Sequence, residues 1–217
     1  MDHLINVIDV ESTCWEKQSK DQISDIIEIG ITVLDPKTFE IISTESIIIK
    51  PAHSTVSKFC TELTTLTQEL VDEQGISFAE AALILKNRYN SANRLFASWG
   101  DYDRKMFLRQ FELYCVENVF GPRHLNIKAL FANVFELKRG IGMDAALKLT
   151  GIPLEGTHHR GDDDSRNISK LLVYILSDKE FEDKLKAYQD VLPPIKSAGP
   201  GAESTARAAK VVDPFAP

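Results

Sequence analysis

The chain has 217 residues, of which 43% are hydrophobic and 26% are charged, and its formal net charge is −7 at pH 7. This length can bury one good hydrophobic core but is too short for two full-sized domains. No stretch sustains the roughly 18 apolar residues that a membrane span needs, and the first residues lack the basic segment of a secretory signal, so we expect a soluble, intracellular, cytoplasmic protein without a membrane partner.

The net negative charge limits the kinds of nucleic acid that the protein is expected to bind. Non-specific binding to phosphate normally comes from a surplus of Lys and Arg on one face, so the charge argues against tight coating of long duplex DNA. It leaves room for an enzyme whose bound divalent cations supply the positive charge at a scissile phosphate.

The three cysteines lie far apart and lack CxxC or CxxH spacing. This pattern indicates neither a disulfide framework nor a zinc site. We expect Cys14, Cys60 and Cys115 to be reduced thiols that are mostly buried.

The first part of the chain is predicted to form strands. Short runs of β-branched and apolar residues, two of them separated by the turn signal Asp35-Pro36-Lys37, are typical of buried strands. They cover residues 4–10, 26–34 and 46–49.

Helical patterns follow these strands. Thr67 can cap a short helix that continues to Glu73, and Ser77 with Glu80 forms a capping box before a helix over residues 78–89. Residues 94–99 return to a strand. Further helices are predicted at residues 104–114, 127–136, 143–150, 163–177 and 179–189. Strands first, and then strands alternating with helices, predict an α/β fold with a mixed sheet.

The composition changes after Val191. Pro, Ala, Gly and Ser dominate residues 192–217, with too few large apolar residues to offset the entropy cost of ordering. We expect one domain over residues 1–191 and a disordered tail over residues 192–217. A flexible tether or a docking peptide is the alternative interpretation of the tail.

Two carboxylates stand at the end of the first predicted strand. Asp9 and Glu11 are two residues apart, so the period of a strand places both on one face. Such a pair can hold a cation at the edge of a sheet. For the pair taken alone, a solvated strand end is the favoured explanation, unless further carboxylates join it.

Two later acidic clusters can join this pair. Asp101 and Asp103 follow the strand at residues 94–99, and one of them would suit a helix N-cap. The run at residues 158–164, HHRGDDD, precedes a strongly apolar helix. Acidic residues stabilise a helix N-terminus, so two of its three aspartates could be structural, but the two histidines before them need another explanation.

Oxygen ligands without a cysteine or multi-histidine set favour Mg²⁺ or Mn²⁺ over zinc. Two such ions about 4 Å apart can stabilise the attacking and leaving oxygens of a phosphodiester displacement. A neutral histidine beside them can accept a proton from the attacking water.

In their order along the chain these motifs resemble those of the DEDDh exonucleases of the DnaQ-like superfamily, and most closely its RNA exonucleases that trim histone mRNA, ribosomal RNA and small interfering RNA. Residues 8–14, IDVESTC, resemble the D-x-E-x-T-C motif of that subgroup. Residues 25–30, DIIEIG, match its second strand, and residues 59–67, FCTELTTLT, resemble its nucleotide-pocket segment. Residues 151–167 match the third motif in spacing.

The resemblance also chooses among the acidic residues. In the family, the second-motif Asp precedes a hydrophobic pair by about one helical turn, which selects Asp103 over Asp101. The family's His and its last metal-binding Asp are five residues apart, which selects His159 and Asp164.

The resemblance implies a ribonuclease H-like fold and a 3′→5′ exonuclease that releases nucleoside 5′-monophosphates from single-stranded nucleic acid, with RNA favoured over DNA. It implies that two Mg²⁺ or Mn²⁺ ions are held by four carboxylates while His159 is the general base. By analogy, Asp9 touches both metals, Glu11 and Asp164 hold the metal nearer the nucleophile, and Asp103 holds the other.

Substrate contacts are expected along the first and pocket motifs, from Thr13, Trp15, Phe59, Thr64 and Thr65. Trp15 and Phe59 could stack on terminal bases or simply pack at the rim of the core. Thr65 stands where the subgroup usually has glycine, which adds a Cβ and a hydroxyl near the expected terminal nucleotide.

Three further residues lie close to these motifs. Trp99 is expected in the core because it ends a strand. Arg160 and Arg166 flank the third motif and could contact phosphate or lie on a solvated helix face.

Two other functions remain compatible with these motifs. A catalytically idle nucleic-acid-binding protein could keep the fold, although it would be expected to lose at least one of the five positions. A DNA-directed proofreading or repair exonuclease would share the same catalytic residues, because chemistry at the 3′ bond does not involve the 2′-hydroxyl.

Overall fold

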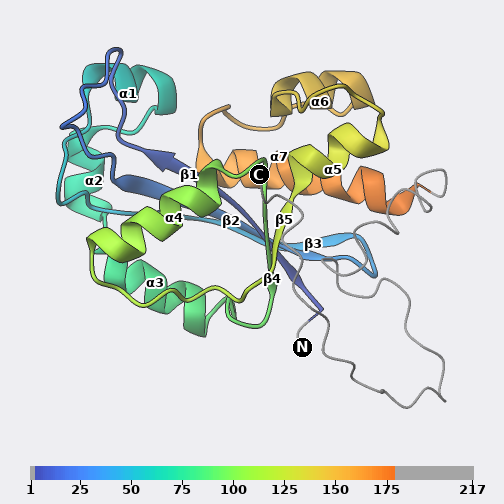
Figure 1. Cartoon of the computed structure of the whole chain (residues 1–217), viewed down its shortest axis with the longest axis horizontal. Coiled ribbons are helices and arrows are strands. Elements are labelled where there is room, and N and C mark those ends of the chain that lie inside the picture. Colours follow the sequence, from blue (N-terminus) through green and yellow to red (C-terminus); the bar gives the residue numbers. More distant parts are fainter. Residues whose placement is uncertain (1–2, 179–217) are drawn as a thin grey trace.

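The computed structural model describes residues 3–178. Within them, five strands form one mixed sheet in the order β3-β2-β1-β4-β5 (Figure 1). The strands are β1 (Ile5–Ser12), β2 (Ile26–Asp35), β3 (Glu40–Ile48), β4 (Leu95–Ser98) and β5 (His124–Asn126). β1, β2 and β3 pair antiparallel, whereas β1, β4 and β5 run parallel. The mixed sheet predicted from the order of elements is confirmed.

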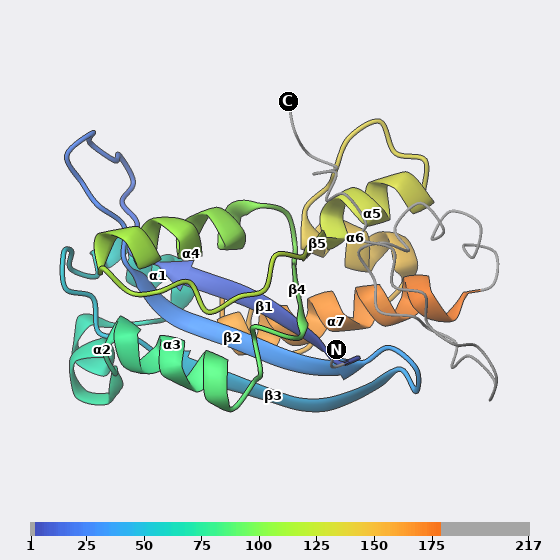
Figure 2. The ribbon, with the colours of Figure 1, turned by 60° about the horizontal axis from the view of Figure 1, so that its bottom comes forward.

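Helices cover both faces of this sheet (Figure 1, Figure 2). They are α1 (Lys58–Thr64), α2 (Gln68–Gln74), α3 (Phe78–Asn87), α4 (Tyr102–Leu113), α5 (Ile127–Val134), α6 (Met143–Thr150) and α7 (Gly161–Ser177). One core lies between the sheet and α5, α6 and α7. A second core lies on the opposite face, against α3 and α4.

Strand β1 divides its side chains between these two cores. Ile5 and Val7 belong to the core beneath α7, while Ile8 and Val10 belong to the core beneath α3 and α4. Alternate residues of a strand share a face, so the row that begins with Ile5 and Val7 continues to Asp9 and Glu11. The first carboxylates of the predicted site therefore extend an apolar row to the end of the strand.

Local signals fixed the ends of several helices. The Thr67 side chain accepts a hydrogen bond from the Leu70 amide, and Ser77 and Glu80 form the predicted capping box. Helix α6 ends at Gly151, which has a φ of 70°. Side chains and a glycine that satisfy terminal backbone groups are the usual stabilisers of helix ends.

Two elements were not predicted, and one was predicted too short. Helix α1 has an N-cap at Ser57 but no acid three residues later to complete a capping box, and its threonines have low helix propensity. Strand β5 has three residues, too few to show a period. Strand β3 begins at Glu40 rather than at 46, because its polar side chains pair along β2.

The expectation for the cysteines was partly wrong. All three are free, but only Cys60 is buried, whereas Cys14 is half-buried and Cys115 is exposed. Cys115 lies just after α4, where it has a left-handed φ of 52°. Trp99 is half-buried and packs against the edge of the core beneath α7, close to the prediction.

Three expectations fall partly or wholly on undescribed residues. The helix predicted at 179–189, the end of the domain at 191 and the tail at 192–217 lie outside residues 3–178. None of the helices within the described range is long and apolar enough to cross a membrane.

Candidate active site

The carboxyl ends of the parallel strands bring the three predicted motifs together. Asp9 and Glu11 end β1, and the chain enters α4 directly after the neighbouring strand β4. The Asp103 carboxylate is 3% exposed and accepts a hydrogen bond from the Val10 amide at 3.0 Å. Adjacent parallel strands end at the same edge of a sheet, which explains how Asp103 reaches the end of β1, where its hydrogen-bond partner Val10 lies 93 residues earlier in the chain.

Asp101 and Asp103 have different positions. Asp101 occupies the N-cap of α4, but its side chain makes no cap hydrogen bond and lies 3.9 Å from His124 Nδ1. Asp103, in the first turn of the helix, faces β1 and is also hydrogen-bonded by Ser98. The Ser98 hydroxyl in turn lies 2.9 Å from His124 Nε2. The structure thus brings Asp103, and not Asp101, to the end of β1.

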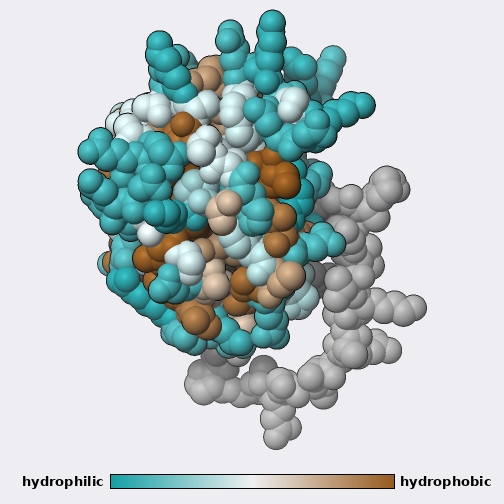
Figure 3. Space-filling model, turned by 90° about the vertical axis from the view of Figure 1, so that its left-hand side faces the viewer, coloured by the Kyte–Doolittle hydropathy of each residue, from teal (hydrophilic) through white to brown (hydrophobic). Residues whose placement is uncertain are grey.

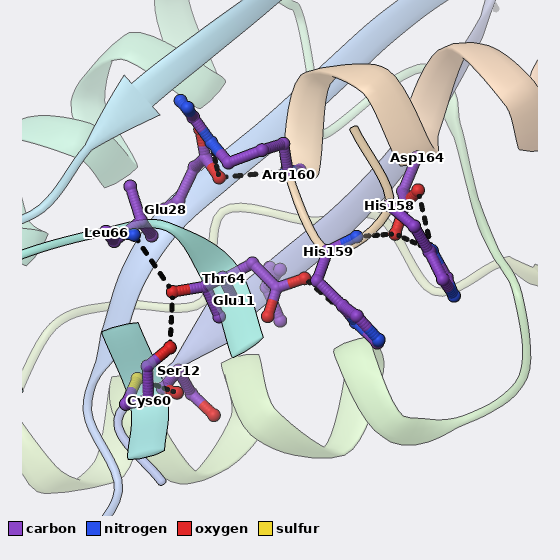
Figure 4. Close-up of polar contacts among 12 residues, drawn as sticks. Glu11, Ser12, Glu28, Cys60, Thr64, Leu66, His158, His159, Arg160 and Asp164 are labelled. Carbon is purple, nitrogen blue, oxygen red and sulfur yellow. Dashed lines mark hydrogen bonds and ion pairs between the residues drawn. The ribbon is translucent and has the colours of Figure 1, made fainter. Parts of the chain in front are cut away.

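The first turn of α7 brings the remaining acid. Asp164 is buried and accepts hydrogen bonds from the His159 amide and the His158 ring, each at 3.0 Å (Figure 4). Asp163 instead accepts the Thr157 amide at 2.7 Å, as expected for an acid that stabilises a turn before a helix. Only one of the three consecutive aspartates points to the acids of β1 and α4.

These groups line a hollow of about 380 Å³. Its lining includes all five predicted catalytic residues, together with a second histidine and several apolar side chains: Asp9, Val10, Glu11, Ser12, Cys14, Leu63, Trp99, Tyr102, Asp103, Gly142, Met143, His158, His159, Asp164 and Ile168. One oxygen from each of Asp9, Glu11 and Asp164 lies within 4.8 Å of the others. This is a spacing that one shared cation can span.

The charge state of the acids also fits a cation site. Burial, and then repulsion from Asp103, Glu11 and Asp164, raises the pKa of Asp9 well above its usual range. Burial and the neighbouring Asp164 raise the pKa of Glu11 to about 9. Burial raises the pKa of Asp103 to about 6, and it also raises that of Asp164. Crowded, buried carboxylates of this kind require protons or cations between them.

The two histidines lie side by side above the acids. Their rings stack at 4.0 Å, and His159 Nδ1 is 3.8 Å from Glu11 Oε1. The backbone of His159 has a left-handed φ of 67°. Burial and the neighbouring His158 lower the pKa of His159, so its neutral form, the one that accepts a proton, predominates at neutral pH.

Arg160 takes neither of the two positions expected for it. Its guanidinium binds the fully buried Glu28 carboxylate of β2, with Nη2 2.9 Å from Oε1 (Figure 4). The same carboxylate accepts the Gly161 amide at 2.8 Å and the Ser46 hydroxyl at 2.6 Å. Glu28 therefore anchors the start of α7 to the sheet. Arg166 forms a partly exposed pair with Asp163 at 3.6 Å.

A second buried acid, Asp25, lies directly before β2 and fixes the start of the motif at residues 25–30. It accepts hydrogen bonds from the His53 amide, the Ser54 hydroxyl and the Tyr114 hydroxyl. Residues 25–30 match a strand of the family, but no role was predicted for Asp25 or Glu28. Acidic residues within and directly before an otherwise apolar strand were the available signal, because a buried charge needs partners.

The five predicted substrate contacts do not line the hollow. Thr13 and Thr64 are fully buried; Thr13 accepts the Asp25 amide, and Thr64 donates to the Cys60 carbonyl. Thr65 is exposed and ends α1 in the left-handed conformation. Trp15 is half-buried and Phe59 is 39% exposed.

Apolar side chains that the prediction omitted reach the hollow instead. They include Leu63 on α1 and Cys14 after β1. Leu63 lies one turn from Phe59, on the same face of α1. Figure 3 shows the end of the molecule that carries α1 and α2, where apolar patches interrupt a polar surface.

Comparison with known proteins gives a consistent result. A family described as exonuclease (RNase_T) matches residues 6–172. Human 3′-5′ exoribonuclease 1 is 29% identical over 183 residues, which cover 80% of this chain and 52% of the relative. Mouse ERI1 exoribonuclease 2 is 30% identical over 79% of this chain and 28% of its own length. The chain thus spans about half or less of these relatives.

Solved structures agree with the fold. The nuclease domain of 3′hExo, described as a DEDDh family member bound to rAMP, superimposes with a TM-score of 0.75 and 26% identity, covering 82% of this chain and 94% of that domain. Cell-death related nuclease 4 superimposes with a TM-score of 0.72 at 18% identity, a likeness of fold.

Proposed function

The chain belongs to the exonuclease family whose pattern spans residues 6–172, and from this premise we propose that it removes nucleoside 5′-monophosphates from the 3′ end of single-stranded nucleic acid, with RNA preferred. Its mixed sheet and flanking helices have the ribonuclease H-like fold of DEDDh exonucleases. The observation that carries the proposal is the convergence of Asp9, Glu11, Asp103, Asp164 and His159 on one hollow.

The four carboxylates are proposed to hold two Mg²⁺ or Mn²⁺ ions. All four offer oxygen, the donor that these cations prefer, and their mutual repulsion is what bound cations would relieve. Bound divalent cations supply Lewis acidity, which activates water and stabilises charge on a phosphodiester. Asp103 is held by the Val10 amide and by Ser98, so its orientation is fixed before any ion binds.

His159 is proposed as the general base. Its neutral form is favoured at neutral pH, and its ring lies beside Glu11, at the edge of the acidic cluster. It would accept the proton of the attacking water at a ring nitrogen. His158 binds Asp164 directly and is proposed to orient this acid rather than to move a proton.

A single-stranded 3′ end suits the size and lining of the hollow. A volume of about 380 Å³ accommodates a nucleotide, not a duplex. Leu63 lines one wall, and Phe59 continues the same apolar face of α1, where a base can stack. The preference for RNA rests on the relatives that are named exoribonucleases.

Degradation of matched, 5′-end-labelled RNA and DNA oligonucleotides, single-stranded and duplex, tests this function. We expect stepwise shortening from the 3′ end, release of 5′-monophosphates with Mg²⁺ or Mn²⁺, and faster degradation of single-stranded RNA. Asp9→Ala serves as the inactive control. Undiminished turnover in excess EDTA, or efficient cutting of a circular strand, would contradict the metal dependence or the exonuclease polarity.

A further inference from the structure

Lys128, near the start of α5, has a half-buried side chain that passes close to two glycines. A Cβ added to Gly140 would lie 2.9 Å from Lys128 Cγ and 3.0 Å from its Cε. A Cβ added to Gly100, whose φ is 109°, would lie 3.7 Å from Lys128 Cδ. The hydrocarbon stem of this lysine therefore occupies a slot that side chains at the two glycine positions would narrow. Ordering of a long side chain costs conformational entropy. Because the slot already restricts the lysine stem, the side chain loses less conformational entropy when its ammonium group binds a ligand.

This slot opens beside the catalytic hollow. Gly100 directly follows Trp99, and Gly140 is two residues before Gly142; both Trp99 and Gly142 line the hollow. The Trp99 indole also donates a hydrogen bond to the Ile141 carbonyl at 3.1 Å, which fastens the loop before α6 to the end of β4. Lys128 is not part of the hollow's own lining. The stem of Lys128 therefore lies outside the lining of the hollow, beside two glycines that are close in the chain to residues of that lining.

Sheet topology also places the start of α5, and with it Lys128, near the catalytic hollow. β4 and β5 run parallel to β1, so α5 starts at the edge of the sheet where Asp9 and Glu11 end β1 (Figure 1). The loop that follows α5 carries two exposed cations, Lys138 and Arg139, immediately before Gly140. Among residues 3–178, none of these three cations forms an ion pair with a carboxylate. In a chain of net charge −7, three unpaired cations beside an acidic site call for an anionic partner.

We propose that Lys128, together with Lys138 and Arg139, binds backbone phosphates of the strand whose 3′ end occupies the hollow, upstream of the bond that is cut. This inference rests on the proposed function. Phosphate contacts of this kind fix the register of a strand without reading its bases. They also give an acidic protein a local cationic track for a short single strand.

The salt dependence of hydrolysis measures this contact. The substrate is a single-stranded RNA 12-mer, and log(kcat/KM) is recorded against log[KCl] with saturating Mg²⁺ for the wild type, Lys128→Gln and Gly140→Ala. Each phosphate contact on a single strand contributes about 0.7 to the slope, so Lys128→Gln is expected to reduce its magnitude by about that amount. Gly140→Ala displaces the lysine stem. Like Lys128→Gln, it is expected to lower kcat/KM, mainly by raising KM.

Two controls separate this effect from general damage. Lys86→Gln removes an equal charge from α3, where Lys86 pairs with Glu117, and is expected to keep the wild-type slope. Hydrolysis of a mononucleotide p-nitrophenyl phosphodiester, which has no upstream phosphate, is expected to be unchanged in Lys128→Gln. A wild type that degrades the 12-mer while Lys128→Gln keeps its slope and KM would overturn this inference alone. A wild type that degrades no oligonucleotide would overturn the proposed function, and this inference with it.

Discussion

Gly30 of β2 and Gly161 of α7 meet backbone to backbone. A Cβ on Gly30 would lie 1.7 Å from the Gly161 carbonyl carbon, and a Cβ on Gly161 would lie 2.7 Å from the Gly30 amide nitrogen. Gly30 is also the residue that pairs with Asp9 across β1 and β2. The two glycines let the start of α7 rest directly on the sheet beside Asp9, and this brings Asp164 to the first-motif carboxylates.

Alanine at either glycine is therefore expected to destabilise the protein by about 3 kcal/mol or more, because the clash is with backbone that cannot rotate away. Thermal or urea unfolding measures the loss. Gly142→Ala is the control, since a Cβ there meets nothing within 4 Å. A Gly30→Ala protein as stable as the wild type would show that α7 can shift off the sheet at no cost.

Arg160→Met is expected to lower the free energy of unfolding by about 3 kcal/mol, because it leaves the fully buried Glu28 carboxylate without its cationic partner. Glu28→Gln added to it should recover part of the loss, since the amide can still accept from Gly161 and donate to Ser46. Arg166→Met, whose pair with Asp163 is longer and partly exposed, should cost under about 1 kcal/mol. Equal losses for the two arginine variants would disprove the anchoring role of Glu28.

Thr65→Gly is expected to stabilise the fold by about 1 kcal/mol. Thr65 ends α1 with φ 65° and ψ −1°, a conformation that is strained for a β-branched residue and free for glycine. Thr61→Gly, within the same helix, should instead destabilise by about 1 kcal/mol. Chemical denaturation compares the two, and a loss of stability in Thr65→Gly would mean that its side chain makes a contact worth more than the strain.

The stability of the metal-free protein is expected to fall as pH rises. The pKa of Glu11 is raised from its ordinary 4.5 to about 9, so the folded state holds a proton that the unfolded state releases between these values. Unfolding is therefore favoured progressively above about pH 4.5. Mg²⁺ or Mn²⁺ should reverse the trend, raising Tm more at pH 8 than at pH 5.5, because the ligands must be ionised.

Glu11→Gln provides the matched test of this linkage. It should raise the metal-free Tm at pH 8 and reduce the response to Mg²⁺, whereas Glu62→Gln on the exposed face of α1 should do neither. A metal-free Tm that increases steadily from pH 5.5 to pH 8 would contradict the raised pKa values.

His159→Ala is expected to slow the chemical step by roughly 10² to 10⁴ while metal affinity changes little, as for loss of a general base. His158→Ala should be milder in rate but should weaken cation binding, because His158 holds Asp164 at 3.0 Å. Single-turnover rates and calorimetric metal titrations separate the two effects. Near-normal cleavage by His159→Ala, or loss of its metals, would refute the assignment.

Much of the fold could be predicted because its signals are local. The alternation of Ile5, Val7, Asp9 and Glu11, the caps at Thr67 and Ser77, and the stop at Gly151 each depend on a few neighbouring residues. The motif resemblance likewise named five residues that do lie around one hollow, although their roles remain predictions. Helix α1 and strand β5 could not be predicted, because the sheet and its neighbours, rather than their own propensities, stabilise them.

The amino-acid sequence by itself determined which chemical groups were available, namely a strand-end pair of acids, two later acids and a histidine pair. Only the tertiary structure decided their uses. In the folded protein, Asp103 points to the end of β1 whereas Asp101 does not, and Arg160 pairs with Glu28. Thr13 and Thr64 are buried, and their hydroxyl groups form hydrogen bonds with the backbone. The physical reason is that burial and pairing depend on contacts between segments far apart in the chain, such as the meeting of Gly30 with Gly161, which no local pattern encodes.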